Sequence, residues 1–464
     1  MFNVNVSSFA LTPGPPPIQA ILTTTDSTPA PKKDYKLNQG QQIAADKFME
    51  FLFSDDKEFI ISGPAGVGKT YLMNYIVDTT MPRYHEMCQL LGEPVLYQDV
   101  VMTATTNKAA EVLSQSVGRP TKTVHSFFNL TVKDDYKTGK TEIQKTKRWM
   151  VHSGKIIFID ESSMIDTELW KTLHEGTVQC KLVYVGDRHQ LAPVQEDLSP
   201  VYKHNTQMVE LLEPVRNAGQ PALMAICQQL RHTVATGTFS PIQVVPGVID
   251  LLDPQQMQDE ILAHFLQQTH QARILAYTNK RVIEYNDHIR SIRGLPDSFT
   301  AGEYLVSSSV VHTARGQIPV EMELEVIRNR GANQIMVDKK EGIHVDVDML
   351  DVKDSLGETF EDIPVMTNRQ HFDELTRYYA RAKDWGKFFE LKNNIADLRP
   401  RDAATVHKSQ GSTYDTVFID LGNISTCHQS QQVARMLYVA FSRARSRVFL
   451  YGDLIKKYGG LILP

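Results

Sequence analysis

The sequence predicts an α/β protein built from two similar domains, and three observations lead to this prediction. A glycine-rich loop at 63–70 lies between an apolar strand and a helix, and two further apolar strands, 156–159 and 182–185, are followed by acidic residues. The strand and polar turn of 100–108 return in a separate region at 274–280. Strands that alternate with helices indicate parallel sheets, and the repeat indicates a second one.

Length and composition are those of a globular protein with more than one domain. A chain of 464 residues exceeds what a single compact core usually contains. No apolar run is long enough to span a membrane, and we expect no secretion signal. The four separated cysteines favour a reducing compartment such as the cytoplasm. A net charge of −5 neither indicates nor excludes a nucleic-acid partner, because a local groove can be basic on an acidic protein.

The first elements are a tail, a helix and a phosphate-binding loop. Residues 1–35 are rich in proline, threonine and serine, so a disordered tail is expected. Gln41 lies in a helix just upstream of the loop, where its amide can contact an adenine edge.

The loop has the spacing of a P-loop, in which glycines let backbone N–H groups surround phosphate at a helix N-terminus. We expect Lys69 to contact the β- and γ-phosphates of ATP and the Thr70 hydroxyl to bind Mg²⁺. The predicted ATP-binding residues of the loop are Gly63, Pro64, Ala65, Gly66, Val67, Gly68, Lys69 and Thr70.

A polar turn and a hairpin come next along the chain. The strand at 100–104 runs into Thr105, Thr106 and Asn107, whose side chains suit contact with a phosphate backbone, although an ordinary helix cap explains them equally well. Residues 129–148 are polar and basic and contain two short alternating segments around the turn 136–140. This pattern predicts a β-hairpin inserted into the α/β domain.

Acidic and amide residues follow the next two strands. Asp160 is predicted to complete the Mg²⁺ site, and Glu161 to orient or deprotonate an attacking water. Gln190 can sense a γ-phosphate, whereas His189 is expected to be only a turn residue. Arg216 ends the first domain with a charge that can enter the nucleotide cleft.

The second region begins near residue 217 and is interrupted. From 297 to 370 the pattern changes to short strands without helices, which predicts a small barrel-like insertion, and 371–395 is helical. The α/β pattern then resumes. Arg443 follows an apolar run near the C-terminus; an arginine brought from a second domain to the γ-phosphate makes hydrolysis depend on domain closure, although a surface arginine is the simpler alternative.

The motifs, taken in order, resemble those of superfamily 1 helicases, and most closely the superfamily 1B branch of RecD-like and phage Dda-like enzymes. The resemblance runs from about residue 37 to 452. Its most specific parts are HKSQG at 407–411 and YVAFSRAR at 438–445. The other matching motifs are Gln41, GPAGVGKT, TATTNKAA, TVHSF, DESSM, GDRHQLAPV, Arg216 and AYTNK.

The resemblance implies two RecA-like domains with ATP between them. Residues 36–216 would form domain 1A, with a strand-separating pin hairpin at about 127–150. Residues 217–296 and 396–464 would form domain 2A, and 297–395 an SH3-like and helical subdomain 2B.

The resemblance also implies residue roles. Lys69, Thr70, Asp160 and Glu161 would act on phosphate, metal and water. Gln190 would couple the γ-phosphate to DNA, Gly411 would contact ATP, and Arg216 and Arg443 would be arginine fingers. The residues expected along the single strand are Thr105, Asn107, His125, Thr278, Asn279, His407 and Ser412.

The expected function is that of an ATP- and Mg²⁺-dependent DNA helicase moving 5′ to 3′, with a role in DNA replication, repair or recombination. Its expected partners are single-stranded DNA and duplex junctions without sequence preference, and single-strand-binding or replication proteins are further candidates. We expect a monomer and no membrane partner. A superfamily 1 RNA helicase and an ATP-driven remover of proteins from nucleic acid remain alternatives, whereas a phosphotransferase would not need the C-terminal motifs.

Overall fold

The computed structural model describes residues 34–138, 140–193, 196–213, 220–313 and 316–464. The predicted disordered tail therefore falls almost wholly outside the described residues. Residues 37–464 form one compact unit, and all features below belong to it.

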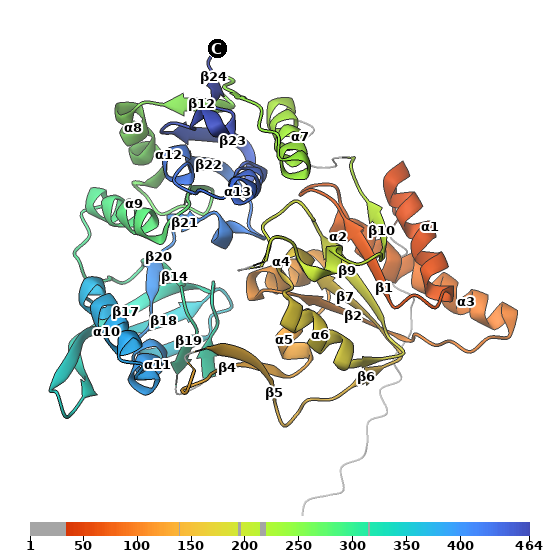
Figure 1. Ribbon diagram of the computed structural model, residues 1–464, viewed down its shortest axis with the longest axis horizontal. Coiled ribbons are helices and arrows are strands. Elements are labelled where there is room, and N and C mark those ends of the chain that lie inside the picture. Colours follow the sequence, from red (N-terminus) through yellow and green to blue (C-terminus); the bar gives the residue numbers. More distant parts are fainter. Residues whose placement is uncertain (1–33, 139, 194–195, 214–219, 314–315) are drawn as a thin grey trace, which may run out of the picture. The chain divides into compact units, whose positions relative to one another are not determined.

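The first sheet is parallel and six-stranded, in the order β10-β1-β9-β7-β2-β3 (Figure 1). Its strands are β1 (Glu58–Ser62), β2 (Asp99–Ala104), β3 (Lys122–Thr123), β7 (Lys155–Asp160), β9 (Lys181–Gly186) and β10 (Gln207–Glu210). Central strands are apolar on both faces because helices cover both. Phe59 and Ile61 pack toward α1 to α4, whereas Ile60 packs toward α5 and α6. These helices are α1 (Gln39–Phe53), α2 (Lys69–Tyr75), α3 (Met81–Leu91), α4 (Asn107–Val117), α5 (Val124–Phe127) and α6 (Thr167–Glu175).

The second sheet is also parallel and has five strands in the order β12-β23-β22-β13-β21. They are β12 (Ile249–Leu252), β13 (Ala272–Ala276), β21 (Ala403–Thr405), β22 (Tyr414–Asp420) and β23 (Ala444–Tyr451). One face packs on α7 (Pro221–Thr236), α12 (Leu421–Ile424) and α13 (Ser430–Ser442), and the other on α8 (Pro254–Phe265) and α9 (Asn279–Ile292). The predicted pair of α/β domains is confirmed.

The third sheet is antiparallel and lies between β13 and β21 in the chain, where the barrel-like insertion was predicted. Its order is β19-β18-β17-β14-β20. The strands are β14 (Tyr304–Ser307), β17 (Glu323–Asp338), β18 (Ile343–Asp354), β19 (Thr359–Met366) and β20 (Leu398–Pro400), accompanied by α10 (Arg369–Arg381) and α11 (Trp385–Asn394).

A two-stranded ribbon leaves the first domain, formed by β4 (Leu130–Asp134) and β5 (Thr141–Lys145) in antiparallel register. It contacts α11: Asn393 Nδ2 donates to Asp134 Oδ2 at 3.1 Å, and the rings of Tyr136 and Phe389 meet edge-on with centroids 5.3 Å apart. The remaining strand pairs are β6 (His152–Ser153) with β8 (Thr177–Val178), β11 (Ile242–Gln243) with β24 (Leu461–Ile462), and β15 (Val311–Thr313) with β16 (Gly316–Ile318). Short turns of helix occupy Ile76–Thr80, Ser162–Met164, Pro200–Tyr202, His407–Ser409 and Lys456–Tyr458.

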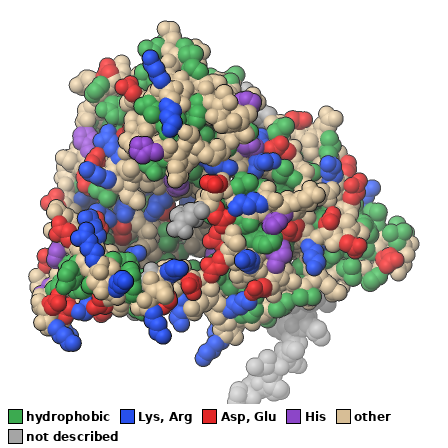
Figure 2. Space-filling view, viewed as in Figure 1, with side chains coloured by type: hydrophobic (Ala, Val, Ile, Leu, Met, Phe, Trp, Pro, Cys, Tyr) green, Lys and Arg blue, Asp and Glu red, His purple; other side chains and the backbone are tan. Residues whose placement is uncertain are grey.

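The surface carries both signs of charge. In Figure 2, acidic and basic side chains are interspersed over the visible face. An anionic partner that binds this face therefore depends on a local group of cations. Over the described residues, no helix combines the length and the apolar character needed to span a bilayer.

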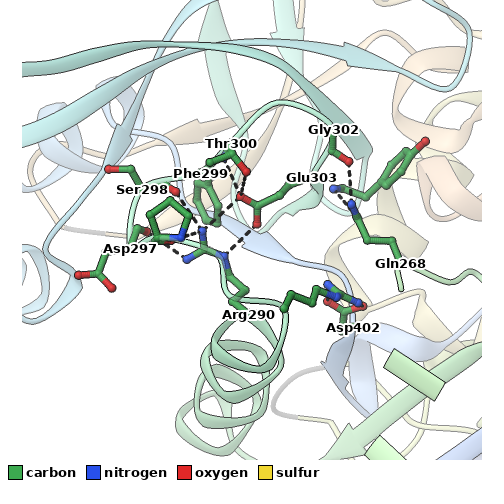
Figure 3. A network of polar contacts seen from close by, with 12 residues as sticks. Gln268, Arg290, Asp297, Ser298, Phe299, Thr300, Gly302, Glu303 and Asp402 are labelled. Carbon is green, nitrogen blue, oxygen red and sulfur yellow. Dashed lines mark hydrogen bonds and ion pairs between the residues drawn. The ribbon is translucent and has the colours of Figure 1, made fainter. Parts of the chain in front are cut away.

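One arginine fixes the junction between the second and third sheets (Figure 3). Arg290, on α9, donates from Nε and Nη2 to the Glu303 carboxylate at 2.9 and 3.2 Å. The same guanidinium donates to the carbonyls of Pro296, Asp297 and Ser298, which lie in the segment leading to β14. Because the ion pair is almost fully buried and each hydrogen bond is charge-assisted, this contact holds the insertion in place on α9.

Candidate active site and nucleic-acid interface

The P-loop follows β1, and glycine is required in it. Gly66 and Gly68 have φ of 85° and 76°, the left-handed region that glycine adopts without strain. A Cβ on Gly63 would lie 2.6 Å from the Leu211 carbonyl oxygen. Gln41 Nε2 donates to the Val67 carbonyl at 3.2 Å, so the Gln41 amide supports the loop, and its predicted adenine contact stays a prediction.

Lys69 and Thr70 lie at the N-terminus of α2, where the sequence placed them. The Lys69 ammonium donates to the carbonyls of Gly63 and Pro64 at 2.7 and 2.9 Å. These bonds hold the ammonium over the loop, which is the position needed to contact phosphates bound by the loop N–H groups.

The acidic pair ends β7, whose Asp160 is in register with Ala104 of β2. Glu161 has φ 53° and ψ 41°, a left-handed conformation that is uncommon for a residue with a side chain and is found at functional sites. Thr105 contacts both acids through their backbone: its N–H donates to the Asp160 carbonyl at 3.2 Å and its hydroxyl to the Glu161 carbonyl at 3.1 Å.

The electrostatics of the acidic pair suit a divalent cation. Burial and the adjacent Glu161 carboxylate raise the pKa of Asp160, and the nearby Lys69 opposes this only in part. Glu161 Oε2 is buried and has no hydrogen-bond partner among the described residues. Two crowded carboxylates are the hard oxygen donors that Mg²⁺ prefers, and the Thr70 hydroxyl of α2 is of the same donor class, so the residues present fit the ion.

The second domain meets this site through the 407–411 segment. A Cβ on Gly411 would lie 3.9 Å from Glu161 Oε1. Gln410 Nε2 donates to Gln190 Oε1 at 3.4 Å, and both glutamines lie at the domain boundary. The structure therefore brings Gly411 to the acidic pair and Gln190, although Gly411 lies more than 200 residues after them in the sequence. Gln410 belongs to a motif that the sequence singled out, but its contact with Gln190 was not predicted.

Of the two predicted arginine fingers, the structure describes one. Arg443 follows α13 and is 3% exposed. Its guanidinium donates to the Ser412 carbonyl at 3.1 Å and to the Ser442 hydroxyl at 3.1 Å, so it is held beside the 407–413 segment. Arg216 lies outside the described residues. Both finger roles stay predictions.

The loop after β9 is held from the second domain by contacts that sequence reasoning missed. The Tyr438 hydroxyl donates to Asp187 Oδ2 at 2.5 Å. Arg435 Nη1 donates to the carbonyls of Arg188, at 2.8 Å, and Gln190. Tyr438 belongs to the YVAFSRAR motif at 438–445, whereas Arg435 lies outside every motif named above.

The same loop contains a second unexpected contact. His189 does occupy a turn, and its N–H donates to Asp187 Oδ1 at 3.0 Å. Its Nδ1 also accepts a hydrogen bond from Arg231 Nε of α7 at 3.0 Å. Burial raises the pKa of Asp187, but hydrogen bonds from His189 and Tyr438 and the charges of Lys69 and Arg231 outweigh burial and hold that pKa well below its usual range. Asp187 is thus a permanent buried anion between the two domains.

Three of the residues predicted along a single strand line one cavity of about 440 Å³: Asn279, His407 and Ser412. Glu161 lines the same cavity, so the cavity reaches the carboxylate that the sequence predicts to act on the attacking water. The other four predicted residues are not part of its lining. Thr105 contacts Glu161, and Thr278 caps α9 and contacts Asn423. Asn107 is exposed at the start of α4. His125 is half-buried in α5, and burial lowers its pKa.

Comparisons with known proteins found matching family models, curated relatives and solved structures. Residues 36–241 match the family model described as an AAA domain, and 402–451 match a UvrD-like helicase C-terminal domain. The ATP-dependent DNA helicase Dda of Enterobacteria phage T4 is 23% identical over 457 residues, covering 89% of this chain and 98% of that protein. An uncharacterized protein of Acanthamoeba polyphaga mimivirus is 21% identical over 497 residues, covering 89% of this chain and 99% of that protein. A crystal structure of Pif1 helicase from Bacteroides in complex with ADP-AlF3 and single-stranded DNA aligns with a TM-score of 0.49 and 16% identity, covering 92% of this chain and 95% of that one.

Proposed function

We propose that this chain, a member of the Dda-like branch of the superfamily 1B helicases, is an ATP-dependent DNA helicase that moves 5′ to 3′ on single-stranded DNA. The observation that carries the proposal is the meeting of Gln190 and Glu161 with Gln410 and Gly411 of the second domain. A nucleotide bound by the P-loop is therefore in reach of both domains, and its hydrolysis changes how they meet.

The chain's own residues account for the chemistry. The P-loop N–H groups and Lys69 bind the phosphates. Glu161 orients the attacking water toward the γ-phosphate and accepts a proton from that water. Mg²⁺, bound by Thr70 and Asp160, would neutralise charge on the phosphate oxygens. Arg443, delivered from the second domain, would stabilise the charge that develops in the transition state.

Movement along the strand follows if opening and closing of the nucleotide cleft is coupled to two sets of strand-contacting residues, one in each domain. Thr105 and Asn107 belong to the first domain, and Thr278, Asn279, His407 and Ser412 to the second. Closing the cleft brings the two sets together, and reopening it separates them, so alternating grip strength moves the strand by one step per cycle. Contacts of this kind are made to the backbone, so no sequence preference is expected.

The substrate is proposed from the relatives, and the setting is proposed from the sequence-based expectation. We propose single-stranded DNA and duplex junctions as the substrate, because the T4 relative is a DNA helicase. We further propose that the chain acts as a monomer in the cytoplasm, in DNA replication, repair or recombination, together with single-strand-binding or replication proteins.

The β4–β5 ribbon is proposed to split the duplex. Asp134 and Tyr136 contact α11 of the insertion, so the ribbon is supported when a force acts on its tip. Each opened step loses roughly 1–2 kcal/mol of stacking, which apolar or aromatic surface on the ribbon replaces in part.

The experiment replaces 133–142 with a short Gly-Ser turn. The proposal predicts that ATPase activity stimulated by single-stranded DNA survives, while unwinding of a 5′-tailed duplex collapses. The same replacement at 339–342, the turn between β17 and β18, is the control and should leave unwinding intact. Unwinding at the wild-type rate would contradict the role of the ribbon in strand separation. Unwinding only from a 3′ tail would contradict the proposed 5′ to 3′ direction of movement.

A further inference from the structure

Two arginines that the helicase motifs do not contain are buried in the wall of the 440 Å³ cavity. Arg273 is on β13, and Arg401 follows β20; both line the cavity together with Asn279 and His407. Their side chains are only 5% and 2% exposed. Each guanidinium lies over an aromatic ring, that of Arg273 4.9 Å from the centroid of Tyr414 and that of Arg401 4.1 Å from the centroid of Tyr304.

The two guanidinium groups share a single carboxylate. Glu323 lies 3.8 Å from Arg273 and 3.4 Å from Arg401. The neighbouring Asp402 is already bound in a bidentate ion pair by Arg293, at 2.7 and 2.8 Å, and Figure 3 shows it near the end of α9 that carries Arg290. Among the described residues, therefore, two buried positive charges are balanced by one negative charge.

The hydrogen bonding of the pair is also incomplete. The Nε atoms of Arg273 and Arg401 are buried and have no hydrogen-bond partner within the described part of the chain. Arg401 Nη1 donates to His270 Nδ1 at 2.7 Å, but a neutral imidazole adds no negative charge. Lys108, which also lines the cavity, adds a further cation near Glu323 and is paired with Glu111 at 3.6 Å.

A buried excess of positive charge is costly unless an anion compensates it. Burial lowers the pKa of Arg401, which shows that its charged form is held at a cost. Much of the remaining cavity wall is apolar, including Val282, Val306 and Val320, and the low dielectric strengthens any ion pair formed there. A planar guanidinium matches the oxygens of a phosphate group in geometry as well as in charge.

We propose that Arg273 and Arg401 together bind one backbone phosphate of the single strand as the strand crosses this cavity. The inference rests on the proposed function, because it takes the strand to be the ligand of the cavity. It adds a fixed phosphate site to the cavity that Asn279 and His407 also line, where the predicted contacts are made by uncharged side chains. Because Glu161 lines the same cavity, a strand phosphate bound here would lie in the cavity that contains the proposed catalytic carboxylate.

The test measures binding of a fluorescein-labelled oligo(dT) to the full chain by anisotropy over a series of salt concentrations. Each lost phosphate contact on a single strand makes the slope of log K against log salt concentration shallower by about 0.7. R273Q and R401Q are each expected to make the slope shallower by up to this amount, because the two arginines share one phosphate, with affinity lowered about tenfold or more at the lowest salt. R401K keeps the charge and should keep the slope. If R401Q does not fold, R273Q carries the same test.

The control is R447Q, which removes an arginine of β23 that is paired with Asp250 at 2.9 Å and does not line the cavity. Its slope should equal that of the wild type. Unchanged slopes in R273Q and R401Q, with wild-type binding intact, overturn the phosphate site and leave the helicase function standing. Absence of oligonucleotide binding by the wild type overturns the proposed function and this inference with it. A rise in the wild-type unfolding temperature in inorganic phosphate that R401Q loses, without a change in the DNA slope, assigns the pair to a free anion and overturns the strand assignment.

Discussion

The hydroxyl of Tyr438 donates a hydrogen bond of 2.5 Å to the carboxylate of Asp187, although 251 residues separate the two. Asp187 follows β9 of the first sheet, and Tyr438 lies on α13, which packs against the second. Arg435, on the same face of α13, donates to the carbonyl of Gln190. One helix of the second domain therefore holds the loop that carries Gln190, and the position of that loop depends on how the domains meet.

Y438F is predicted to weaken the coupling between DNA binding and ATP hydrolysis. The substitution removes a donor from a buried carboxylate, at a cost of about 1–3 kcal/mol, and frees the loop from α13. Stimulation of the ATPase rate by single-stranded DNA should fall, while nucleotide affinity, which depends on the P-loop, should change little. The measurements are the ATPase rate with and without DNA and titration of a fluorescent nucleotide.

Y458F is the matched control for that experiment. Tyr458 is equally buried in the second domain and donates to the Cys427 carbonyl at 2.6 Å, but this bond stays within the domain. A similar loss of stability with normal DNA stimulation is expected. Equal loss of stimulation in Y438F and Y458F would show that the effect is general destabilisation and would contradict the role of the Asp187 contact.

K69A and E161Q should both abolish turnover but differ in binding. Loss of Lys69 removes a phosphate contact and should weaken nucleotide affinity. Loss of the Glu161 charge should leave affinity largely intact while it slows the chemical step by roughly a hundredfold or more. Single-turnover hydrolysis and nucleotide titration measure the two effects, and near-wild-type turnover in E161Q would remove this residue from the catalytic role.

The pair formed by His174 and Glu58 predicts a pH-dependent contribution to stability. Burial lowers the pKa of His174, but the bond to Glu58, at 2.9 Å, and the Trp170 carbonyl raise it overall above 6.5. A raised folded-state pKa means that the stabilisation is complete below about pH 6.5 and is lost as pH rises through the folded-state value. The wild type should therefore unfold at a higher temperature than H174Q near about pH 5.5, and the difference should shrink toward about pH 8.5. A difference independent of pH would show that the imidazolium charge contributes nothing.

Contiguous motifs made much of the site predictable from the sequence, whereas contacts across the domain boundary could not be predicted. The P-loop and the acidic pair each follow a strand of one parallel sheet, so strand topology alone brings Lys69 and Asp160 to the same edge. The contacts of Arg231 and Arg435 depend on the docking of two sheets, which no local pattern encodes. Arg401 was overlooked because an arginine is rarely buried, and only its surroundings in the fold show that it is.

Polar turn residues show the same limit on a smaller scale. Thr105 and Thr278 both follow strands, as a backbone contact requires, and both belong to matching motifs. In the structure the Thr105 hydroxyl donates to the Glu161 carbonyl, and Thr278 caps α9. The sequence could not separate a strand contact from a local one because the same side-chain chemistry serves both. Asn279, one residue further along, does line the cavity.

The ATPase rate with single-stranded DNA, with RNA of the same length and with no nucleic acid tests the central claim most directly. If binding of a strand in the cavity favours the contact of Gln410 with Gln190, DNA should raise the Mg²⁺-dependent ATPase rate strongly. RNA should stimulate less. Equal rates with and without DNA would contradict a DNA-driven motor, and stronger stimulation by RNA would make the chain an RNA helicase.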